Sequence, residues 1–359
     1  MMRNAWAHNG CNAAGACRLL LALCACLVAF DAQTMDLQEE QPGFVTARHQ
    51  AMGTEFVFTL WPPSPEMGLD DVRRVAELAF EMIDGLERRI SNWIPESHIS
   101  RINQFAGHRP VETTQEMIAL LLTCRHFHRE SGGAFDVTVG PLLDLWGFYR
   151  NEGVIPDNAA IEEALAKVGM DKVEIDEEKQ RVRFATPDMR IDFGGIGKGL
   201  ALDRAAYILR EQGVKSAILH GGTSTVVVIG TPPDGSDWKV RVRSPYNDIN
   251  KHLDEVVIRN ESLSTSSGSE KFFELEGRRY CHIFDPRTGR PVEGVLSVTV
   301  IAPTGVESDA LSTAFFVMGL EQTKAYCRAH PGIRAVFVVS DAGALKPVRV
   351  NFPGEEERS

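Results

Sequence analysis

The sequence predicts an α+β fold, built as a single large domain of mostly antiparallel strands with interspersed helices. Short strand-like segments follow one another at separations suited to hairpins, which join antiparallel neighbours. Residues 70–90 carry apolar residues at helical spacing and indicate an amphipathic helix. No linker-like stretch interrupts the chain from Phe44 to Phe352, so most of its 359 residues fit one large domain.

The individual elements are expected in a mixed order along the chain. Helical spacing of apolar residues predicts helices at residues 70–90, 114–130, 161–168, 199–212, 309–318 and 321–329. The fourth of these helices should stop at Gly213. Runs rich in β-branched and aromatic residues predict strands, of which the second and third form a hairpin. These strands are expected at residues 56–60, 173–175, 182–184, 216–219, 225–229, 238–242, 255–258, 272–275, 298–301, 335–339 and 348–350.

The composition is that of a globular protein with an acidic surplus. Hydrophobic residues make up 43% and charged residues 24% of the chain, and its net charge is −11. This balance argues against a nucleic-acid-binding protein, which needs a basic face for the phosphates, but it allows a small anionic ligand at a local site. After residue 26 only Cys124, Cys281 and Cys327 remain, and their isolation favours free buried thiols.

The N-terminal residues have the pattern of an export signal. Arg3 and Arg18 precede an apolar run over residues 19–30, which is shorter than the roughly 20 residues of a membrane-spanning helix. Residues 23–26 read Leu-Cys-Ala-Cys and resemble a bacterial lipobox with Cys26 as the lipidated residue, and the alternative is cleavage after Ala29 or Ala32. We therefore expect a signal peptide at 1–30, an acidic tether at 31–43, the main domain at 44–352 and a charged tail at 353–359.

Three closely spaced glycines and a lysine interrupt regular sequence in residues 191–199, which read Ile-Asp-Phe-Gly-Gly-Ile-Gly-Lys-Gly. We interpret them as a strand end leading into a helix whose first N–H groups suit a phosphate. Neither common phosphate motif fits. Asp192 and Gly199 occupy positions where a P-loop needs Gly and Ser or Thr, and Leu200 is too large for a dinucleotide fingerprint. A plain strand–helix turn is the alternative.

A helix start coincides with hard oxygen ligands in residues 307–313, which read Glu-Ser-Asp-Ala-Leu-Ser-Thr. Ser308 is expected to be the N-cap, and Asp309 in the first turn favours the helix dipole. Asp309 and Thr313 share a face at i and i+4. A carboxylate with a hydroxyl is ligation of the kind that Mg2+ takes together with water and substrate phosphate. Spacing alone leaves both interpretations open.

Two further segments place polar groups beside turns. His282 is expected at a strand end, before Asp285-Pro286 and a Gly turn, where it suits either a general base or a structural role. The segment at 132–142 reads Gly-Gly-Ala-Phe-Asp-Val-Thr-Val-Gly-Pro-Leu. It is either a binding loop or an ordinary strand entry.

Together and in this order, these segments resemble the ApbE family of FAD:protein FMN transferases. The resemblance extends from about Met52 to about Gly319. Its most specific parts are the His-x-x-Asp-Pro-x-Thr-Gly pattern at 282–289 and the Ser-Asp-Ala-x-x-Thr pattern at 308–313. It also includes Ala-Met-Gly-Thr at 51–54, Ser-Asn-Trp at 91–93, Ser-His-Ile-Ser-Arg-Ile-Asn at 97–103 and the loop at 135–142. The fold that it implies is an ApbE-type, T-fold-like α+β domain.

The resemblance implies roles for individual residues, and His282 matches the catalytic base. FAD contacts are implied for Met52, Trp93, Ala134, Phe135, Asp136, Asp192, Lys198 and Ile283. Metal ligation is implied for Gly195 (through its backbone carbonyl), Asp309, Ser312 and Thr313. Trp93 replaces a Tyr that the family often has, so a stacking ring is kept and a hydroxyl is lost. Ser312 replaces an Asp that reaches the metal in some members, so the site has one carboxylate fewer.

The implied reaction is Mg2+-dependent transfer of the FMN half of FAD to a Ser or Thr hydroxyl of a target protein. A base takes the proton of the hydroxyl, AMP leaves, and FMN stays attached through a phosphoester. The same site suits an FAD pyrophosphatase, in which water replaces the protein hydroxyl. A third alternative is a non-catalytic periplasmic FAD carrier, against which the presence of His282 argues.

The expected partners are FAD and a separate acceptor protein, with no nucleic acid. Family acceptors resemble Asp-x-x-Ser/Thr-Ala/Gly-Thr, and this chain has no such motif, because residues 309–314 have Thr313 where Ala or Gly belongs. We therefore expect a second chain as acceptor, of the membrane-associated redox type. The export signal predicts the periplasmic side of a bacterial membrane, with the protein either soluble or lipid-anchored at Cys26.

Overall fold

The structure is a computed structural model of the chain, and it describes residues 43–64, 67–246, 252–341 and 343–354. All of these belong to one compact unit, Met35–Ser359. The expected signal peptide, nearly all of the tether and residues 355–359 of the tail lie outside the described residues. Among the helices that are described, none is long and apolar enough to cross a membrane.

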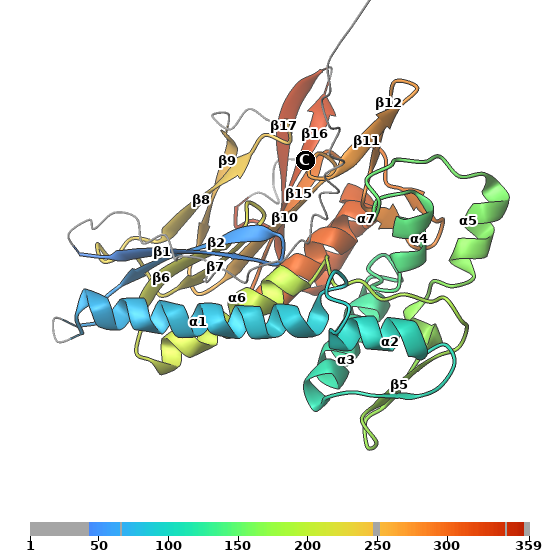
Figure 1. The fold of residues 1–359 in the computed structure, drawn as a ribbon. Helices are drawn as coiled ribbons and strands as arrows, with labels where there is room; N and C mark the ends of the chain where they lie inside the picture. Colours follow the sequence, from blue (N-terminus) through green and yellow to red (C-terminus); the bar gives the residue numbers. More distant parts are fainter. Residues whose placement is uncertain (1–42, 65–66, 247–251, 342, 355–359) are drawn as a thin grey trace, which may run out of the picture. The chain divides into compact units, whose positions relative to one another are not determined.

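An eight-stranded sheet organises the domain (Figure 1). Every neighbouring pair of its strands is antiparallel, which confirms the expected α+β fold of mostly antiparallel strands. In spatial order the strands are β1 (Val45–Ala51), β2 (Thr54–Trp61), β6 (Ser216–Gly221), β7 (Thr225–Ile229), β10 (Ser262–Ser267), β15 (Ser297–Ala302), β16 (Arg334–Asp341) and β17 (Ala344–Val350).

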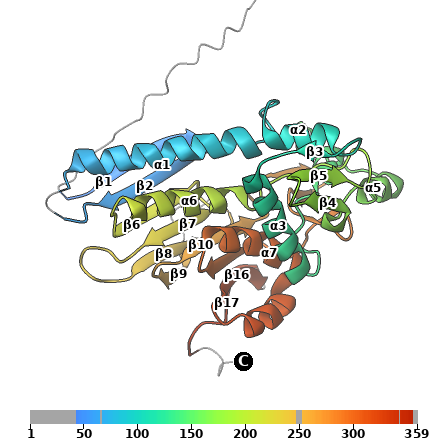
Figure 2. The ribbon, with the colours of Figure 1, turned by 90° about the horizontal axis from the view of Figure 1, so that it is seen from below.

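Three long helices cover one face of this sheet and lie side by side (Figure 2). They are α1 (Leu69–Ile90), α6 (Gly197–Glu211) and α7 (Gly305–Ala329). The middle helix, α6, contacts both of the others, and α7 packs on β10 and β15. The shorter helices are α2 (His98–Phe105), α3 (Gln115–Glu130), α4 (Gly140–Leu145), α5 (Asn158–Leu165) and a 3-10 turn, η1 (Met170–Lys172).

A two-stranded ribbon covers the opposite face of the sheet. It consists of β8 (Trp238–Arg243) and β9 (His252–Ile258). β7 shows the resulting two-sided burial, because Val227 and Ile229 join the core under the helices, whereas Val226 and Val228 join the core under the ribbon. Cover on both faces explains why every residue of β7 and β15 is buried, so that neither strand alternates between buried and exposed positions.

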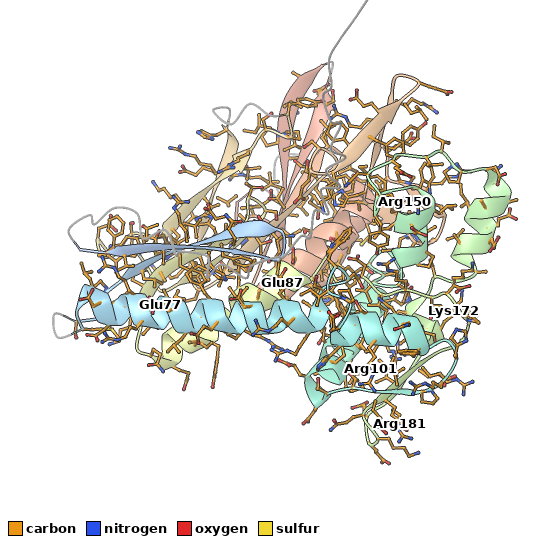
Figure 3. The ribbon with its side chains drawn as sticks, in the orientation of Figure 1. Glu77, Glu87, Arg101, Arg150, Lys172 and Arg181 are labelled. Carbon is orange, nitrogen blue, oxygen red and sulfur yellow. The ribbon has the colours of Figure 1, made fainter. Side chains whose placement is uncertain are left out.

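Smaller elements extend the domain beside the sheet. They are the three-stranded sheet of β3 (Val111–Glu112), β5 (Arg181–Phe184) and β4 (Val173–Asp176), and the hairpins of β11 (Phe272–Leu275) with β12 (Arg278–Cys281) and β13 (Phe284–Asp285) with β14 (Arg290–Pro291). Lys172, labelled in Figure 3, donates to the carbonyl oxygens of Leu165 and Val168 and so satisfies the end of α5. Arg181, also labelled, pairs with Glu112 of β3 at 2.6 Å.

The start of α7 differs from the expectation. Thr304, rather than Ser308, is the N-cap: its hydroxyl accepts from the Glu307 N–H at 3.2 Å, and the Glu307 carboxylate accepts from the Thr304 N–H at 3.2 Å. The helix therefore begins a turn earlier than predicted. The expected division near residue 319 is confirmed, because Gly319 has a φ of 73° inside the element.

Other differences are also local. No strand precedes the glycine-rich turn at 194–196, because Arg190 makes only an isolated bridge with Val139 and residues 191–193 have no regular structure. The segment at 132–142 is a series of turns that leads into α4, so it is not a strand entry. α5 begins three residues earlier than expected, where the Asp157 side chain accepts from the Ala160 N–H at 2.8 Å. The three described cysteines are free and buried, as expected.

Candidate active site

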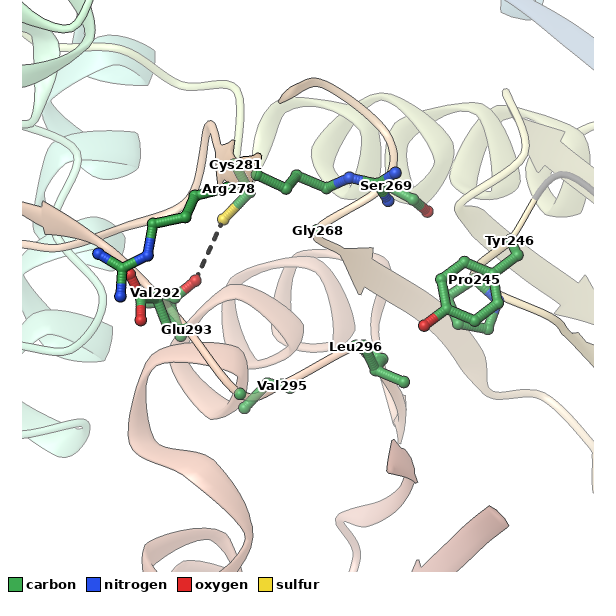
Figure 4. A pocket seen from close by; sticks show the side chains of 12 residues that line it. Pro245, Tyr246, Gly268, Ser269, Arg278, Cys281, Val292, Glu293, Val295 and Leu296 are labelled. Atoms are coloured by element: carbon green, nitrogen blue, oxygen red, sulfur yellow. Dashed lines mark hydrogen bonds between the residues drawn. The ribbon is translucent and has the colours of Figure 1, made fainter. Parts of the chain in front are cut away.

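A cavity of about 620 Å³ brings together the predicted site residues. Every one of them except Ser312 lines it: Met52, Trp93, Ala134, Phe135, Asp136, Asp192, Gly195, Lys198, His282, Ile283, Asp309 and Thr313. A smaller cavity of about 280 Å³ lies behind the β11–β12 hairpin and is lined by Tyr246, Arg278 and Cys281 (Figure 4). It contains none of the predicted residues, so we place the candidate active site in the larger cavity.

Asp309 is a buried carboxylate in the lining of this cavity, with an exposed fraction of 4%. One carboxylate oxygen accepts from the Gly199 N–H at 2.9 Å, and the other accepts from the hydroxyls of Ser264 at 2.9 Å and Thr225 at 3.4 Å. None of these donors carries a charge. A buried carboxylate that is solvated only by neutral donors favours a cation beside it, because burying an unpaired charge is costly.

A close crossing of two helix N-termini puts Asp309 in this position. A Cβ atom on Gly199 of α6 would lie 2.0 Å from the carbonyl oxygen of Gly305 of α7, so no side chain fits there. Asp203 of α6 closes the same crossing, because its carboxylate accepts from the N–H groups of Gly305 at 2.6 Å and Val306 at 2.9 Å. Burial raises the pKa of Asp203, and these two hydrogen bonds act in the opposite direction.

Thr313 and Gly195 lie next to one another in the lining of the cavity. A Cβ atom on Gly195 would lie 3.1 Å from the Thr313 Oγ1 atom. The Thr313 hydroxyl donates to the Asp309 carbonyl oxygen at 3.4 Å and lies 3.5 Å from Ser266 Oγ, which leaves at least one of its lone pairs for a ligand in the cavity. Ser312 is different: its buried hydroxyl donates to the same carbonyl at 2.9 Å and bonds to Ser266 at 2.9 Å. Sequence reasoning grouped Ser312 with the metal ligands, but the structure does not bring it to the cavity.

The available oxygen atoms suit a hard divalent cation. Within the described ranges, no three His, Cys, Asp or Glu side chains come together as a metal-binding group. One carboxylate (Asp309), one hydroxyl (Thr313) and a backbone carbonyl (Gly195) form a hard, incomplete donor set. Mg2+ commonly binds through one or two carboxylates and completes its octahedron with water and substrate phosphates, so the residues present fit Mg2+.

His282 follows β12 directly and is half-buried at the cavity. Its Nδ1 atom lies 3.0 Å from the Lys271 carbonyl oxygen. A carbonyl can only accept, so we assign the proton of the neutral ring to Nδ1, which leaves the Nε2 lone pair free. Burial lowers the pKa of His282, the charges of Lys271 and Lys198 act in the same direction, and Glu270 opposes them. The ring is therefore neutral at pH 7, as a general base requires.

Asp192 is held at the cavity by a network that includes a residue not singled out from the sequence. Its carboxylate accepts from the Tyr149 hydroxyl at 2.8 Å, the Asn92 side-chain amide at 3.1 Å and the Gly194 N–H at 2.8 Å. Burial, together with the neighbouring Asp192 charge, raises the pKa of Tyr149. The Tyr149 ring meets Trp93 edge-on at 5.8 Å. Tyr149 belongs to none of the sequence motifs, and no signal in the sequence marked it as a site residue.

Asp136 lines the cavity, but its carboxylate is bound by protein groups. The oxygens accept from the Thr138 N–H at 2.7 Å, the Thr138 hydroxyl at 2.6 Å and the Met170 N–H at 3.0 Å. His128 Nδ1 lies 3.1 Å away, and its hydrogen bond with Asp136 raises the pKa of His128. Asp136 therefore fixes the loop that presents Ala134 and Phe135 to the cavity.

Met52 occupies an unusual backbone conformation at the tip of the β1–β2 hairpin. Ala51 pairs with Thr54, so Met52 and Gly53 form a two-residue turn with φ values of 52° and 71°. Such turns favour Asn-Gly or Gly-Gly, because a long side chain is disfavoured at positive φ. The side chain of Met52 lines the cavity. This supports a ligand contact as the reason for a methionine at this turn.

The fold and this cavity define a class of protein: an α+β domain that joins a helix N-terminus, a buried carboxylate with a neighbouring hydroxyl and a neutral histidine in one cavity. The chain belongs to the ApbE family, whose family model matches residues 52–337.

Named relatives and solved structures agree with this assignment. A FAD:protein FMN transferase of Salmonella typhimurium is 31% identical over 315 residues, which cover 85% of this chain and 89% of the relative. One from Klebsiella pneumoniae is 30% identical over 295 residues, covering 80% and 83%. The crystal structure of an ApbE protein from Thermotoga maritima has a TM-score of 0.75 and 33% identity, covering 84% and 96%. The flavin transferase ApbE from Vibrio cholerae has a TM-score of 0.74 and 25% identity, covering 86% and 97%.

Proposed function

We propose that this protein transfers the FMN moiety of FAD to a Ser or Thr hydroxyl of a separate acceptor protein, releases AMP and requires Mg2+. The observation that carries the proposal is that His282 and Asp309 line the same cavity. His282 is neutral with a free Nε2, and the buried Asp309 carboxylate accepts only from neutral donors, which favours a cation beside it. Similarity to proteins named FAD:protein FMN transferase supports the choice of substrate.

The proposed step is a displacement at phosphorus. The acceptor hydroxyl oxygen forms a bond to the FMN-side phosphorus of FAD, and its proton passes to Nε2 of His282. The bond from that phosphorus to the bridging oxygen breaks, and AMP leaves with the electron pair. Asp309, Thr313 and the Gly195 carbonyl would hold Mg2+, which when bound neutralises charge on the pyrophosphate. Lys198, in the first turn of α6, lines the same cavity and would contribute a further positive charge beside the pyrophosphate.

The apolar part of the cavity would bind the rings of FAD. Phe135 and Ile283 are buried side chains of the lining, and Met52 adds a flexible thioether. Trp93, with an exposed fraction of 69%, offers an open ring face at the rim on which a flavin or adenine ring can stack. Tyr149 holds Asp192 and borders the same rim.

Product analysis distinguishes the proposal from its alternatives. The purified protein would be mixed with FAD, Mg2+ and a protein or peptide carrying the Asp-x-x-Ser/Thr-Ala/Gly-Thr sequence, and the products identified by mass spectrometry. We expect an FMN adduct on Ser or Thr and one AMP per adduct. Free FMN and AMP without an adduct would indicate a pyrophosphatase, and intact FAD would indicate a carrier. Omission of Mg2+ is the matched control, and undiminished transfer without it would contradict the metal requirement.

We also propose that the protein is exported and acts on the periplasmic side of a bacterial membrane, on a membrane-associated redox protein. The support is the charged start and signal-length apolar run of residues 1–30. The mass of the protein isolated from its native host tests this. We expect the first 25 or so residues to be absent. A diacylglyceryl group on Cys26 would identify a lipid anchor, and a full-length mass would contradict export.

A further inference from the structure

Strand β10 faces helix α7 through a ladder of buried hydroxyl groups. Ser262 Oγ lies 2.8 Å from Ser308 Oγ, and Ser264 Oγ lies 2.9 Å from the Asp309 carboxylate. On the next rung Ser266 Oγ lies 2.9 Å from the Ser312 hydroxyl. Alternate residues of a strand point to one face, so the three serines of β10 form one row against the helix.

Of the three serines, only Ser264 has a charged partner. Ser264 donates to the Asp309 Oδ1 atom, whereas Ser262 and Ser266 meet neutral hydroxyls. The other described donor to that oxygen is the Thr225 hydroxyl, at 3.4 Å. Thr225 also lies 3.2 Å from Ser264. Hydrogen bonds to a charged acceptor are stronger than neutral ones, so Ser264 is the main restraint on this half of the carboxylate.

The two ends of the carboxylate are held from opposite elements. The Gly199 N–H of α6 fixes Oδ2 at 2.9 Å, and Ser264 of β10 fixes Oδ1 at 2.9 Å. Together they define the rotation of the carboxylate about its χ2 angle. The remaining lone pairs are thereby aimed in one direction. Ser264 itself has an exposed fraction of 1% and does not line the cavity, so it acts on a ligand only through Asp309.

We propose that Ser264 is a positioning residue that orients the Asp309 carboxylate toward the cavity and thereby sets the affinity of the site for Mg2+. The inference rests on the metal-dependent function proposed above. Groups that hydrogen-bond a ligating side chain commonly contribute about 10- to 100-fold to metal affinity when they are removed one at a time. Without Ser264, Oδ1 would keep only the long contact from Thr225, and the carboxylate would be held firmly at Oδ2 alone, by the Gly199 N–H.

The ladder supplies its own matched control. Ser262→Ala removes the same hydroxyl from the same strand at a residue with an exposed fraction of 0%, against 1% for Ser264, but its partners are Ser308 and the Val226 carbonyl oxygen and not Asp309. Ser264→Thr keeps the donor. Thr225→Val removes the secondary donor with little change of shape, and its effect should be smaller because its contact is longer. All four variants would be compared with the wild type.

Two readouts are needed: the rise in melting temperature caused by Mg2+ in the presence of FAD without acceptor, and the Mg2+ concentration giving half-maximal transfer. For Ser264→Ala we expect the Mg2+ requirement to rise about 10-fold or more, with FAD affinity and the rate at saturating Mg2+ largely kept. Ser264→Thr should restore the wild-type requirement, and Ser262→Ala should lower the metal-free melting temperature only.

The outcomes separate the two proposals. If Ser264→Ala and Ser262→Ala require the same Mg2+ concentration as the wild type, Ser264 has only a structural role and the inference is overturned, while the proposed function stands. If the wild type itself is neither stabilised by Mg2+ nor dependent on it for transfer, the metal-dependent part of the proposed function falls, and the positioning role of Ser264 falls with it.

Discussion

The two walls of the cavity differ in burial and in connectivity. One wall is formed by α6, α7 and β10, where Asp309 is 4% exposed and each of its oxygens accepts from a different element. The other wall is formed by the segment after α1 and the end of β12, where Trp93 is 69% exposed and His282 is half-buried. The first wall is part of the main core, and the second borders the cavity mouth.

This difference corresponds to two tasks. A carboxylate that holds a cation and a pyrophosphate works best where fixed dipoles replace water, because electrostatic interactions are stronger in a region of low dielectric. A base that serves a second protein must remain within reach of it. The buried wall should therefore control the binding of metal and phosphate, and the open wall should control transfer to the acceptor.

The largest effect is expected at the buried wall. Asp309→Ala should abolish turnover, because it removes the only carboxylate of the proposed metal site. FAD binding should weaken less, because the contacts to its rings remain. Transfer measured across a Mg2+ titration, beside FAD binding by fluorescence, tests this expectation. Near wild-type turnover at the wild-type Mg2+ requirement would remove Asp309 from the site and end the distinction between the walls.

The helix crossing that supports Asp309 should tolerate no side chain. In Gly199→Ala the new methyl group would lie 2.0 Å from the Gly305 carbonyl oxygen, so α6 and α7 must separate. We expect a loss of about 1–3 kcal/mol of unfolding free energy together with a higher Mg2+ requirement. Gly85→Ala in α1 is the control, because its methyl group would meet nothing closer than 3.8 Å. Equal melting temperatures for the two variants would contradict the close crossing.

The open wall should determine the pH dependence of transfer. The pKa of His282 lies below its ordinary value of 6.5, because of burial and the nearby Lys271 and Lys198 charges. The basic form therefore persists below neutral pH. The transfer rate should be constant above about pH 6.5 and fall, approaching tenfold per pH unit, only as the pH drops below the lowered pKa. Single-turnover rates across this range provide the test, and a decline that begins above pH 7 would contradict the assignment.

A smaller effect is expected where the two walls meet. Tyr149→Phe keeps the ring beside Trp93 and removes the hydroxyl that donates to Asp192. Asp192 retains its bonds from Asn92 and Gly194. We expect a loss of about 1 kcal/mol, seen as a several-fold weaker affinity for FAD, with an unchanged Mg2+ requirement. A large change in the Mg2+ requirement would show that the rim and the buried wall are not independent.

Local signals made much of the fold readable from the sequence. α1 has a continuous apolar stripe, and β4 and β5 alternate apolar and charged residues on either side of a short turn, so each was predicted near its observed bounds. β10 was not predicted, because Ser-Leu-Ser-Thr-Ser-Ser lacks the apolar character of a buried strand. Its serines are satisfied by Ser308, Asp309 and Ser312, which lie about 45 residues further along the chain.

The candidate site, like the fold, was predictable where a short motif marks it and not where a contact joins distant residues. The residues of the cavity were found through family motifs, which list residue types in order but give no orientation. Ser312 was therefore grouped with the metal ligands, although it is not among the residues that line the cavity and its buried hydroxyl bonds to Ser266 and to the Asp309 carbonyl oxygen. Tyr149 and Ser264 were missed, because each acts through a carboxylate distant in the sequence and no short motif records such a contact.

The role of His282 is the most direct test of the proposed division of labour. His282→Asn should leave FAD binding, Mg2+ stabilisation and the melting temperature close to those of the wild type, since the buried wall is untouched. Single-turnover transfer with saturating FAD and Mg2+ should fall by about 10²- to 10⁴-fold, the usual contribution of a positioned general base. Wild-type transfer by a well-folded, FAD-loaded His282→Asn protein would contradict the account, and so would a parallel loss of stability and FAD affinity with turnover per folded molecule retained.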